Sequence, residues 1–282
     1  MTGSFPAVEG YGEIEAMEYM IGGEAANSSI VLARLGESVL LDGNWLGDDQ
    51  AGNRTRNLLA NNGIDTSRLQ LRTDYSGVEE VIFAADGRRT IFGTYGSLLE
   101  KEEWNSPIES DVTASSVVSL DPFFRGPALT IAKTASKNDI PVVTVDCRHD
   151  DPLLPHVAAV VVAESFIREH YSQQNTEALL ADYAAATDGL VIFTFGDKPI
   201  VYTRSGCKLR TTPPYSVQAV DTTGAGDSFR AGIVYGFLHG CDDDRMVDYA
   251  SAVAAINCTR APGVLNSPSA SEVQELIDSG SS

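Results

Sequence analysis

A glycine-rich turn followed by a carboxylate is the part of this sequence best suited to chemistry. The residues Gly224-Ala225-Gly226 precede Asp227, and the apolar pattern of 229–238 predicts that a helix begins here. Backbone N–H groups in the first turn of a helix point toward one place, and the helix dipole adds about half a positive charge. Glycine also lets the backbone approach a bound group closely. The segment therefore predicts an anion hole suited to a phosphoryl group in transfer.

Asp227 is the candidate general base of this segment. A carboxylate at the start of a helix stays ionised, and it can take the proton of a hydroxyl that attacks a phosphoryl group in line. The competing interpretation is a carboxylate that only lies at a helix start, behind a tight turn. The pattern is neither the Gly-x-x-x-x-Gly-Lys-Ser/Thr phosphate loop nor the dinucleotide pattern Gly-x-Gly-x-x-Gly. Spacing alone leaves both interpretations open.

Two motifs far apart in the chain resemble those of the ribokinase-like (PfkB) carbohydrate kinase family. The segment 221–229, which reads Asp-Thr-Thr-Gly-Ala-Gly-Asp-Ser-Phe, resembles the C-terminal signature of that family. The segment 22–27, Gly-Gly-Glu-Ala-Ala-Asn, is similar to its N-terminal Gly-Gly-x-x-x-Asn signature, and 47–52 fits the Gly-x-Asp-x-x-Gly stretch that follows. The motifs stand in the expected order, and the resemblance covers the chain from about residue 10.

The resemblance implies an ATP-dependent kinase that transfers a phosphoryl group to a sugar hydroxyl. Asp227 would be the base, and the anion-hole donors would be Gly224, Ala225 and Gly226. Acceptor contacts are implied for three residues of the N-terminal motif, namely Gly22, Gly23 and Asn27. Nucleotide contacts are implied for a second set in the C-terminal half, namely Thr194, Gly196, Thr222, Ser251 and Asn257.

The resemblance also bears on metal ions. The family's Asn-x-x-Glu segment, which helps to organise Mg²⁺, is missing from the expected stretch 160–169, so Mg²⁺ would be held mainly by ATP phosphates and water. Many members bind a monovalent cation through residues that resemble Asp221 and the loop 261–267, which makes K⁺ a further candidate. Arg89 and Arg148 are candidate contacts to phosphate or sugar, and the alternative for both is an ordinary surface charge. Pro199 stands where the family often has glycine, so the nucleotide loop is expected to differ in shape.

The elements that must position these residues follow from the hydrophobic pattern. Short β-branched runs alternate with helical stretches, which predicts an α/β fold with a mostly parallel sheet flanked by helices in three layers. Strands are expected at 39–41, 117–120, 142–145, 157–162, 190–193 and 216–220. Helices are expected between Gly23 and Gly36 and at 53–62, 128–138, 176–187, 227–239, 245–259 and 271–277.

A β-rich excursion interrupts this pattern. The runs 78–85 and 89–95 flank Asp86-Gly87, a strong hairpin signal, and they are too short to form a separate domain. The resemblance implies that this hairpin, with 13–20 as another strand, is a small β-sheet lid over the active site. The expected division is a kinase core of 23–71 and 98–282 and a lid of 10–22 and 72–97. Lid edges pair in several family members, so a homodimer is a candidate.

One departure from the family concerns the start of the sheet. The family begins with a strand that carries an aspartate for the sugar, whereas the first aspartate of this sequence is Asp42. We therefore expect the first core strand to be missing. A missing strand would expose the neighbouring sheet edges.

Composition narrows the class of protein. Hydrophobic residues make up 43% and charged residues 21%, which is typical of a folded globular chain. The formal net charge of −19 disfavours nucleic acid and anionic membranes as partners, and neither an apolar run of membrane-spanning length nor a secretory signal is evident. Four scattered cysteines without a Cys-x-x-Cys pair, and four histidines without metal-ligand spacing, indicate reduced thiols in a cytoplasmic protein.

Three functions are compatible with these motifs and patterns. The leading one is a sugar kinase of ribokinase, fructokinase or ketohexokinase type. A nucleoside kinase of the same fold would use apolar lid residues to stack on a base, for which Phe83, Phe92 and Tyr95 are candidates, although they equally suit packing within a hairpin. A non-catalytic binding protein that has kept the fold is the third, favoured by the missing strand and disfavoured by the intact 224–227 segment.

Overall fold

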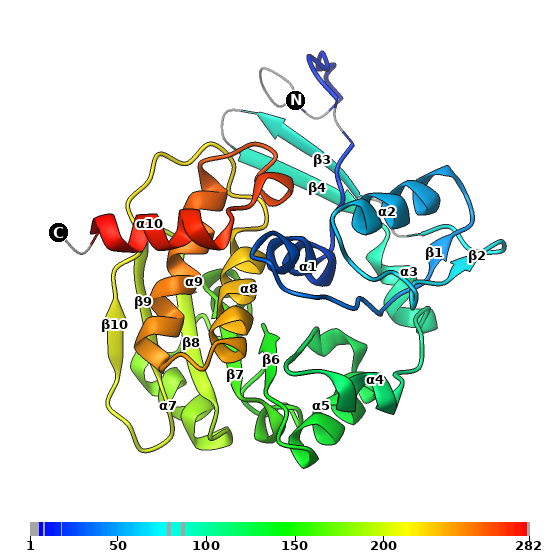
Figure 1. Ribbon diagram of the computed structural model, residues 1–282. Helices are drawn as coiled ribbons and strands as arrows, with labels where there is room; N and C mark the ends of the chain where they lie inside the picture. Colours follow the sequence, from blue (N-terminus) through cyan, green and yellow to red (C-terminus); the bar gives the residue numbers. More distant parts are fainter. Residues whose placement is uncertain (1–5, 8, 18, 78–79, 86–87, 281–282) are drawn as a thin grey trace.

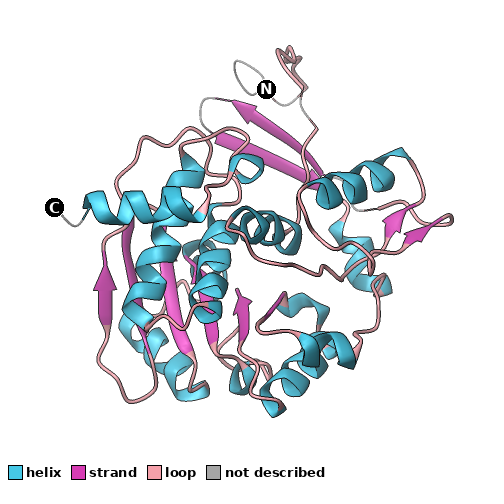
Figure 2. Ribbon diagram, viewed as in Figure 1, coloured by secondary structure: helices cyan, strands magenta, loops and turns pink. Residues whose placement is uncertain are grey.

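The computed structural model describes residues 6–7, 9–17, 19–77, 80–85 and 88–280. The side chains of Phe83, Arg89 and Tyr95, named above as candidates, lie outside the part that is described. Figure 1 shows the fold along the chain, and Figure 2 shows its helices and strands.

A six-stranded sheet forms the centre of the molecule, in the order β10-β9-β8-β7-β6-β5. Strands β5 to β8 are parallel to one another, and β9 and β10 join antiparallel at one side. The strands are β5 (Val118–Leu120), β6 (Val142–Val145), β7 (Ala159–Ala163), β8 (Leu190–Phe195), β9 (Lys198–Thr203) and β10 (Arg210–Thr212). The expected mostly parallel sheet is confirmed.

Alternation along the strands divides the core in two. On β7, Ala159 and Val161 pack in one hydrophobic cluster, while Val160 and Val162 pack in the other. Successive side chains of a strand point to opposite faces, so a strand buried on both sides is apolar throughout. The β-branched runs of the sequence are therefore strands covered on both faces.

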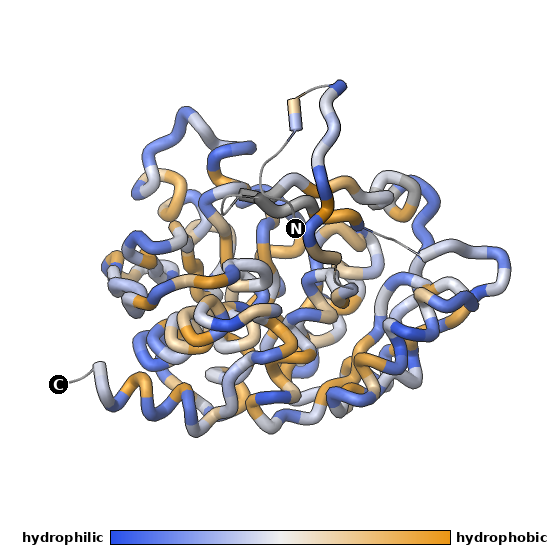
Figure 3. The backbone as a smooth tube through the Cα atoms, turned by 90° about the horizontal axis from the view of Figure 1, so that it is seen from above, coloured by the Kyte–Doolittle hydropathy of each residue, from blue (hydrophilic) through white to orange (hydrophobic). Residues whose placement is uncertain are grey.

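Helices cover the two faces of this sheet, which confirms the three-layer α/β fold (Figure 1). One face carries α1 (Glu24–Arg34), α8 (Ala225–Leu238), α9 (Asp243–Cys258) and α10 (Ala270–Gly280). The other carries α5 (Gly126–Lys137) and α7 (Thr176–Ala186). The remaining helices are α2 (Gln50–Asn61), α3 (Tyr95–Lys101), α4 (Glu109–Ala114) and α6 (Glu164–His170). Helix α10 alternates hydrophobic and hydrophilic positions as a surface helix does (Figure 3).

Two small pairs of strands lie outside the main sheet. Strand β1 (Leu46–Gly47) is parallel to β2 (Leu71–Arg72), and β3 (Glu80–Ala85) forms an antiparallel hairpin with β4 (Arg88–Gly93). The hairpin is the β excursion expected from the sequence, although its turn lies outside the described residues.

Three expected strands are wrong. The stretch 39–41 makes only an isolated bridge between Leu40 and Asp65. The stretch 216–220 is irregular, because the N–H of Val220 donates to the carbonyl of Cys258 at the end of α9 rather than to a neighbouring strand. The described residues of 13–20 are irregular too, and Met17 and Tyr19 are exposed there.

The described residues before Glu24 contain no strand, so the sheet has β5 at its edge. Among the described helices, none combines the length and the apolar composition that a bilayer crossing needs.

Candidate active site

The two sequence motifs meet where helices α1 and α8 begin. Asn27 on α1 donates a hydrogen bond from its Nδ2 atom to Oδ2 of Asp227 on α8, over 2.7 Å, although 200 residues separate them. Ser28, next in α1, donates to the carbonyl of Asp227 over 3.3 Å. Ligands of open α/β sheets bind outside the carboxyl ends of the parallel strands. Asp121 and Asp146, which directly follow β5 and β6, act electrostatically on Asp227, so the site lies at this edge.

The start of α8 depends on Gly224. This residue has a φ of +74°, a left-handed conformation that favours glycine. A Cβ atom there would lie 2.3 Å from Cγ2 of Val264, so the turn has no room for a side chain. The amide of Ala225 donates to the carbonyl of Thr222 over 3.2 Å, which closes the turn ahead of the helix. Asp227 then falls in the first turn of α8, beside the positive end of the dipole.

The start of α1 is built in a similar way. Gly23 is the N-cap residue with a φ of +98°, and its carbonyl accepts the N–H of Asn27 over 2.9 Å. Gly22 lies next to the hairpin, since a Cβ atom there would be 4.0 Å from Oε2 of Glu80 on β3. Gly22 therefore lies beside the hairpin, one residue before the N-cap of the helix that carries Asn27.

Electrostatics set the protonation of Asp227. Burial raises the pKa of its carboxyl group, while the hydrogen bond from Asn27 and the charge of Arg230 lower that pKa in part. A carboxylate with a raised pKa is a stronger base toward a hydroxyl. The arrangement can therefore accept a proton next to the dipole end of α8.

Sequence reasoning missed a buried charged group beside Asp227. Arg230, three residues later in α8, donates from Nε to Oγ of Ser119 over 2.7 Å and from Nη1 to Asp121. Its Nη1 atom also lies 4.0 Å from Oε2 of Glu24. The available signal was an arginine within the apolar run 229–238, where a charge needs a buried partner.

Glu24 is the second missed residue. The pKa of its carboxyl group is raised to about 8, chiefly by burial and next by the charge of Asp121, while the charge of Arg230 opposes the rise. The side chain as a whole is 42% exposed, but its Oε2 atom is buried and has no hydrogen-bond partner among the described residues. The buried oxygen decides the direction of the shift, which favours the protonated form of Glu24.

The candidate nucleotide residues lie in several places. Thr194 is near the end of β8, and Gly196 makes the turn to β9 with a φ of +66°. Asn257 is fully buried on α9, where it donates to the carbonyl of Thr223 over 3.5 Å and accepts from Ser267. Ser251 is also buried, and its hydroxyl has no partner among the described residues. Their nucleotide roles stay predictions.

Asp221 connects the turn before α8 to the loop 261–267. Its Oδ1 atom accepts the N–H of Thr223 over 2.9 Å, and its Oδ2 atom accepts the N–H of Gly263 over 3.4 Å. The described residues contain no group of three His, Cys, Asp or Glu side chains that could hold a metal ion. A monovalent cation at Asp221 stays a prediction.

The stretch 47–52 has a structural role that explains its pattern. Asp49 is the N-cap of α2 and accepts the N–H of Gly52 over 2.8 Å. A Cβ atom on Gly52 would lie 1.9 Å from the carbonyl oxygen of Gly47, so a side chain cannot fit there. Among the candidate basic residues, Arg148 is paired with Asp150 at the surface over 3.0 Å.

Comparison with known proteins identifies the family of this chain. Residues 3–270 match the model of the pfkB family of carbohydrate kinases. A ribokinase of Haemophilus influenzae is 26% identical over 91% of this chain and 87% of its own length. A nucleoside kinase of Methanothermobacter thermautotrophicus is 28% identical over 89% and 82%. An ATP-dependent ribose-1-phosphate kinase of Halopiger xanaduensis is 29% identical over 96% and 91%.

Solved structures share the fold. The structure of Arabidopsis thaliana ribokinase complexed with ribose and ATP superposes with a TM-score of 0.83, covering 98% of this chain and 93% of that one. Its sequence identity of 19% limits that comparison to the fold.

Proposed function

Because the chain belongs to the pfkB family of carbohydrate kinases, which includes phosphotransferases acting on sugar hydroxyls, we propose that it transfers the γ-phosphoryl group of ATP to a hydroxyl of a sugar. One observation supports this most directly, namely the 2.7 Å hydrogen bond between Asn27 and Asp227. It brings the candidate acceptor residue and the candidate base together at the start of α8.

In this proposal Asp227 takes the proton of the acceptor hydroxyl. Asn27 orients the carboxylate through Oδ2, which leaves Oδ1 of Asp227 to meet the acceptor. The N-terminal end of α8 stabilises the negative charge of the phosphoryl group as it moves, with Gly224, Ala225 and Gly226 forming the turn. Gly22 and Gly23 place the β3–β4 hairpin over the acceptor, and closure would exclude water.

ATP and Mg²⁺ fit the donor set around this helix. The dipole end of α8 suits phosphate oxygens, and Thr194, Gly196, Thr222, Ser251 and Asn257 are the proposed nucleotide region. Mg²⁺ usually keeps several waters and binds phosphate oxygens rather than a dedicated protein cage, so the ATP phosphates and water would hold most of its coordination. Mg²⁺ would neutralise charge on the phosphates. K⁺ beside Asp221 is the further proposed ion.

A nucleoside kinase is the second candidate. The hairpin exposes apolar side chains, with Phe92 61% and Val81 55% exposed, and the aromatic ring of Phe92 can stack on a base. A nucleoside kinase is also among the relatives. In this proposal the lid comprises 10–22 and 72–97, and the core comprises 23–71 and 98–282. The same exposed side chains would also suit a homodimer in which the lids of two copies pair.

The test measures ADP release with Mg²⁺-ATP and K⁺ across pentoses, hexoses, ketoses, sugar acids, sugar phosphates and nucleosides. We expect release that depends on a sugar and falls by at least about 10³-fold in Asp227→Ala, because a base and its charge are lost together. The fold and ATP binding should survive that substitution.

A matched control is Asp150→Ala, which removes a surface carboxylate that pairs with Arg148. Turnover of nucleosides instead of sugars would favour the second candidate. Equal activity of Asp227→Ala and the parent, or ATP binding without turnover of any acceptor, would contradict the proposal and favour a non-catalytic binding protein.

A further inference from the structure

Arg230 is a charged side chain inside an otherwise apolar helix. It lies three residues after Asp227 on α8, and only 1% of its side chain is exposed. A buried guanidinium is tolerated only where partners satisfy it, so its surroundings explain its presence.

The partners of Arg230 come from the elements that carry the site. Its Nε atom donates to Ser119 on β5, and its Nη1 atom donates to Asp121 directly after that strand. The same Nη1 atom lies 4.0 Å from Oε2 of Glu24 in the first turn of α1. One side chain therefore connects the carboxyl end of β5 to the starts of α1 and α8.

Arg230 is also the cation of an acidic cluster. Four carboxyl groups interact with its charge or with one another: Glu24 from α1, Asp121 after β5, Asp146 after β6 and Asp227 from α8. Burial raises the pKa of Asp227, and the charges of Asp121 and Asp146 raise it further. Arg230 and the hydrogen bond from Asn27 lower it, while His170 acts on Asp146.

Polar atoms of this cluster lack partners. Within the described residues, three buried atoms make no hydrogen bond: Nη2 of Arg230, Oε2 of Glu24 and Oδ1 of Asn27. Buried polar atoms are almost always paired, so three unpaired atoms in one cluster indicate that its arrangement serves more than stability.

We propose that Arg230 is a positioning residue, which fixes the end of β5 against the starts of α1 and α8 and supplies the positive charge that keeps Asp227 ready to accept a proton. The proposal rests on the proposed function, in which Asp227 is the base. It assigns a role in the reaction to a side chain outside both sequence motifs.

A purely structural role is the competing explanation. A buried ion pair between Arg230 and Asp121 would stabilise or orient the fold without any effect on Asp227. The two explanations differ in the direction of pH effects, because Arg230 lowers the pKa of Asp227 whereas Asp121 raises it.

The experiment compares Arg230→Gln with Asp121→Asn. Each pair member is replaced by a neutral side chain that still forms hydrogen bonds. We expect the acidic limb of kcat/KM to move to higher pH in Arg230→Gln, by about one unit or more. At the parent's midpoint, a shift of one unit lowers kcat/KM about fivefold. The limb should move to lower pH in Asp121→Asn.

Two further variants keep the test decisive. Arg230→Lys retains the charge, so its acidic limb should stay within about half a pH unit of the parent's, even where KM for the acceptor rises. If Arg230→Gln does not fold, Asp121→Asn and Arg230→Lys still carry the test. Arg204→Met removes a different paired arginine and should leave the profile unchanged.

A second readout separates this proposal from the proposed function. Carboxyl ¹³C NMR titration of aspartate-labelled protein, with the Asp227 signal assigned from Asp227→Asn, reports the same shifts without any turnover. The pKa of Asp227 should rise in Arg230→Gln and fall in Asp121→Asn. If it does so in a protein that phosphorylates no acceptor, the electrostatic role of Arg230 is supported and the proposed kinase activity is overturned. Unchanged profiles and titrations in folded Arg230→Gln and Asp121→Asn would overturn the role of Arg230.

Discussion

At the scale of single residues, the site is a set of carboxyl groups whose charge is controlled by burial. Asp227 and Glu24 both have a pKa above the ordinary value, and desolvation is the main cause for each. Asn27 and Arg230 act in the other direction on Asp227. The chemistry of the 224–227 segment therefore depends on groups from elsewhere in the chain.

Glu24 makes stability depend on pH. Its pKa is raised to about 8 from an ordinary 4.5, so between these values the folded protein holds a proton that the unfolded chain has lost. Stability contributed by this group therefore falls as pH rises from about 4.5 to 8 and is constant above that. Glu24→Gln cannot ionise, so we expect its Tm advantage over the parent to be small at pH 5 and largest above pH 8.

Thermal unfolding followed by circular dichroism from pH 5 to 9 measures this. Glu164→Gln is the matched control, because Glu164 also begins a helix but its pKa is lowered by its hydrogen bond to Lys198. Relative to the parent, that control should show the same Tm difference from pH 5 to 9, because the stability contributed by a lowered pKa is fully present above the ordinary value of 4.5. A Tm difference for Glu24→Gln that does not change with pH would contradict the shift.

At the scale of elements, the turn before α8 depends on one glycine. We expect Gly224→Ala to destabilise the protein by about 1–3 kcal/mol, because φ of +74° is strained for alanine. The new Cβ atom would also meet Cγ2 of Val264 at 2.3 Å. Urea unfolding at constant m-value measures the loss.

Gly226 is the matched control in the same turn. It lies inside α8, and a Cβ atom there would have nothing within 4 Å. Gly226→Ala should therefore be neutral or stabilise by about 0.5–1 kcal/mol, since alanine favours helix. Equal effects of the two substitutions would show that the turn, as described, does not constrain Gly224.

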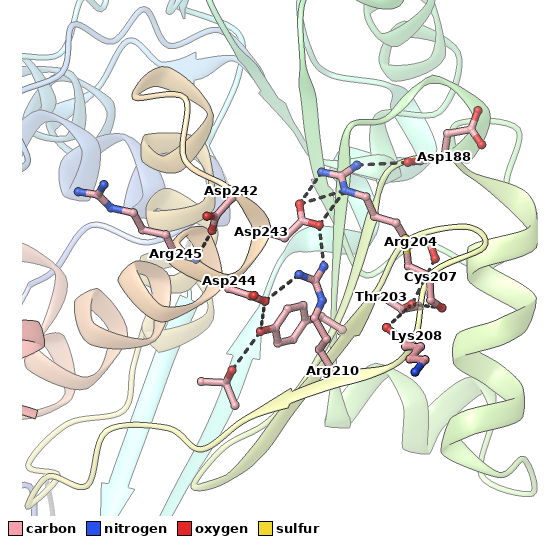
Figure 4. A network of polar contacts seen from close by, with 12 residues as sticks. Asp188, Thr203, Arg204, Cys207, Lys208, Arg210, Asp242, Asp243, Asp244 and Arg245 are labelled. Atoms are coloured by element: carbon pink, nitrogen blue, oxygen red, sulfur yellow. Dashed lines mark hydrogen bonds and ion pairs between the residues drawn. The ribbon is translucent and has the colours of Figure 1, made fainter. Parts of the chain in front are cut away.

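At the scale of the whole molecule, a network of ion pairs connects helix α9 to the main sheet. Arg204 and Arg210 both pair with Asp243 at the start of α9 (Figure 4). Burial alone would raise the pKa of Asp243, but hydrogen bonds from these arginines bring it below the ordinary value. Arg204 also donates to the carbonyl of Asp188, just before β8 begins. The network therefore holds the start of α9 against the end of the sheet that lies away from the site.

The net charge of −19 predicts a response to salt. Like charges repel in the compact state, and salt screens that repulsion, so we expect Tm to rise by at least about 3 °C between 0.05 and 1 M NaCl. The exposed ion pairs weaken over the same range, but isolated surface pairs contribute little. In Arg204→Met, which raises the net negative charge, the rise should be larger. A falling Tm would indicate that the ion pairs outweigh the repulsion.

The sequence by itself determined the layered fold and the two glycine motifs. Burial on both faces of a strand requires a continuous apolar run, and this local pattern identified β6, β7 and β8. A turn that binds phosphate needs glycine at fixed spacing, and this pattern predicted Gly224 and Asp227 as residues of such a turn. Both signals are local, so a short stretch of sequence carries them.

Only the tertiary structure decided which distant groups surround Asp227. Asn27 is 200 residues from Asp227 in the chain, and Asp121 is held near Asp227 by its hydrogen bond from Arg230. No spacing rule connects these positions. The strand expected at 216–220 was wrong for the same reason, because the backbone of Val220 bonds to the end of α9 and not to a strand. Contacts between residues far apart in the chain depend on packing, because each hydrogen bond needs a partner that only the folded chain brings near.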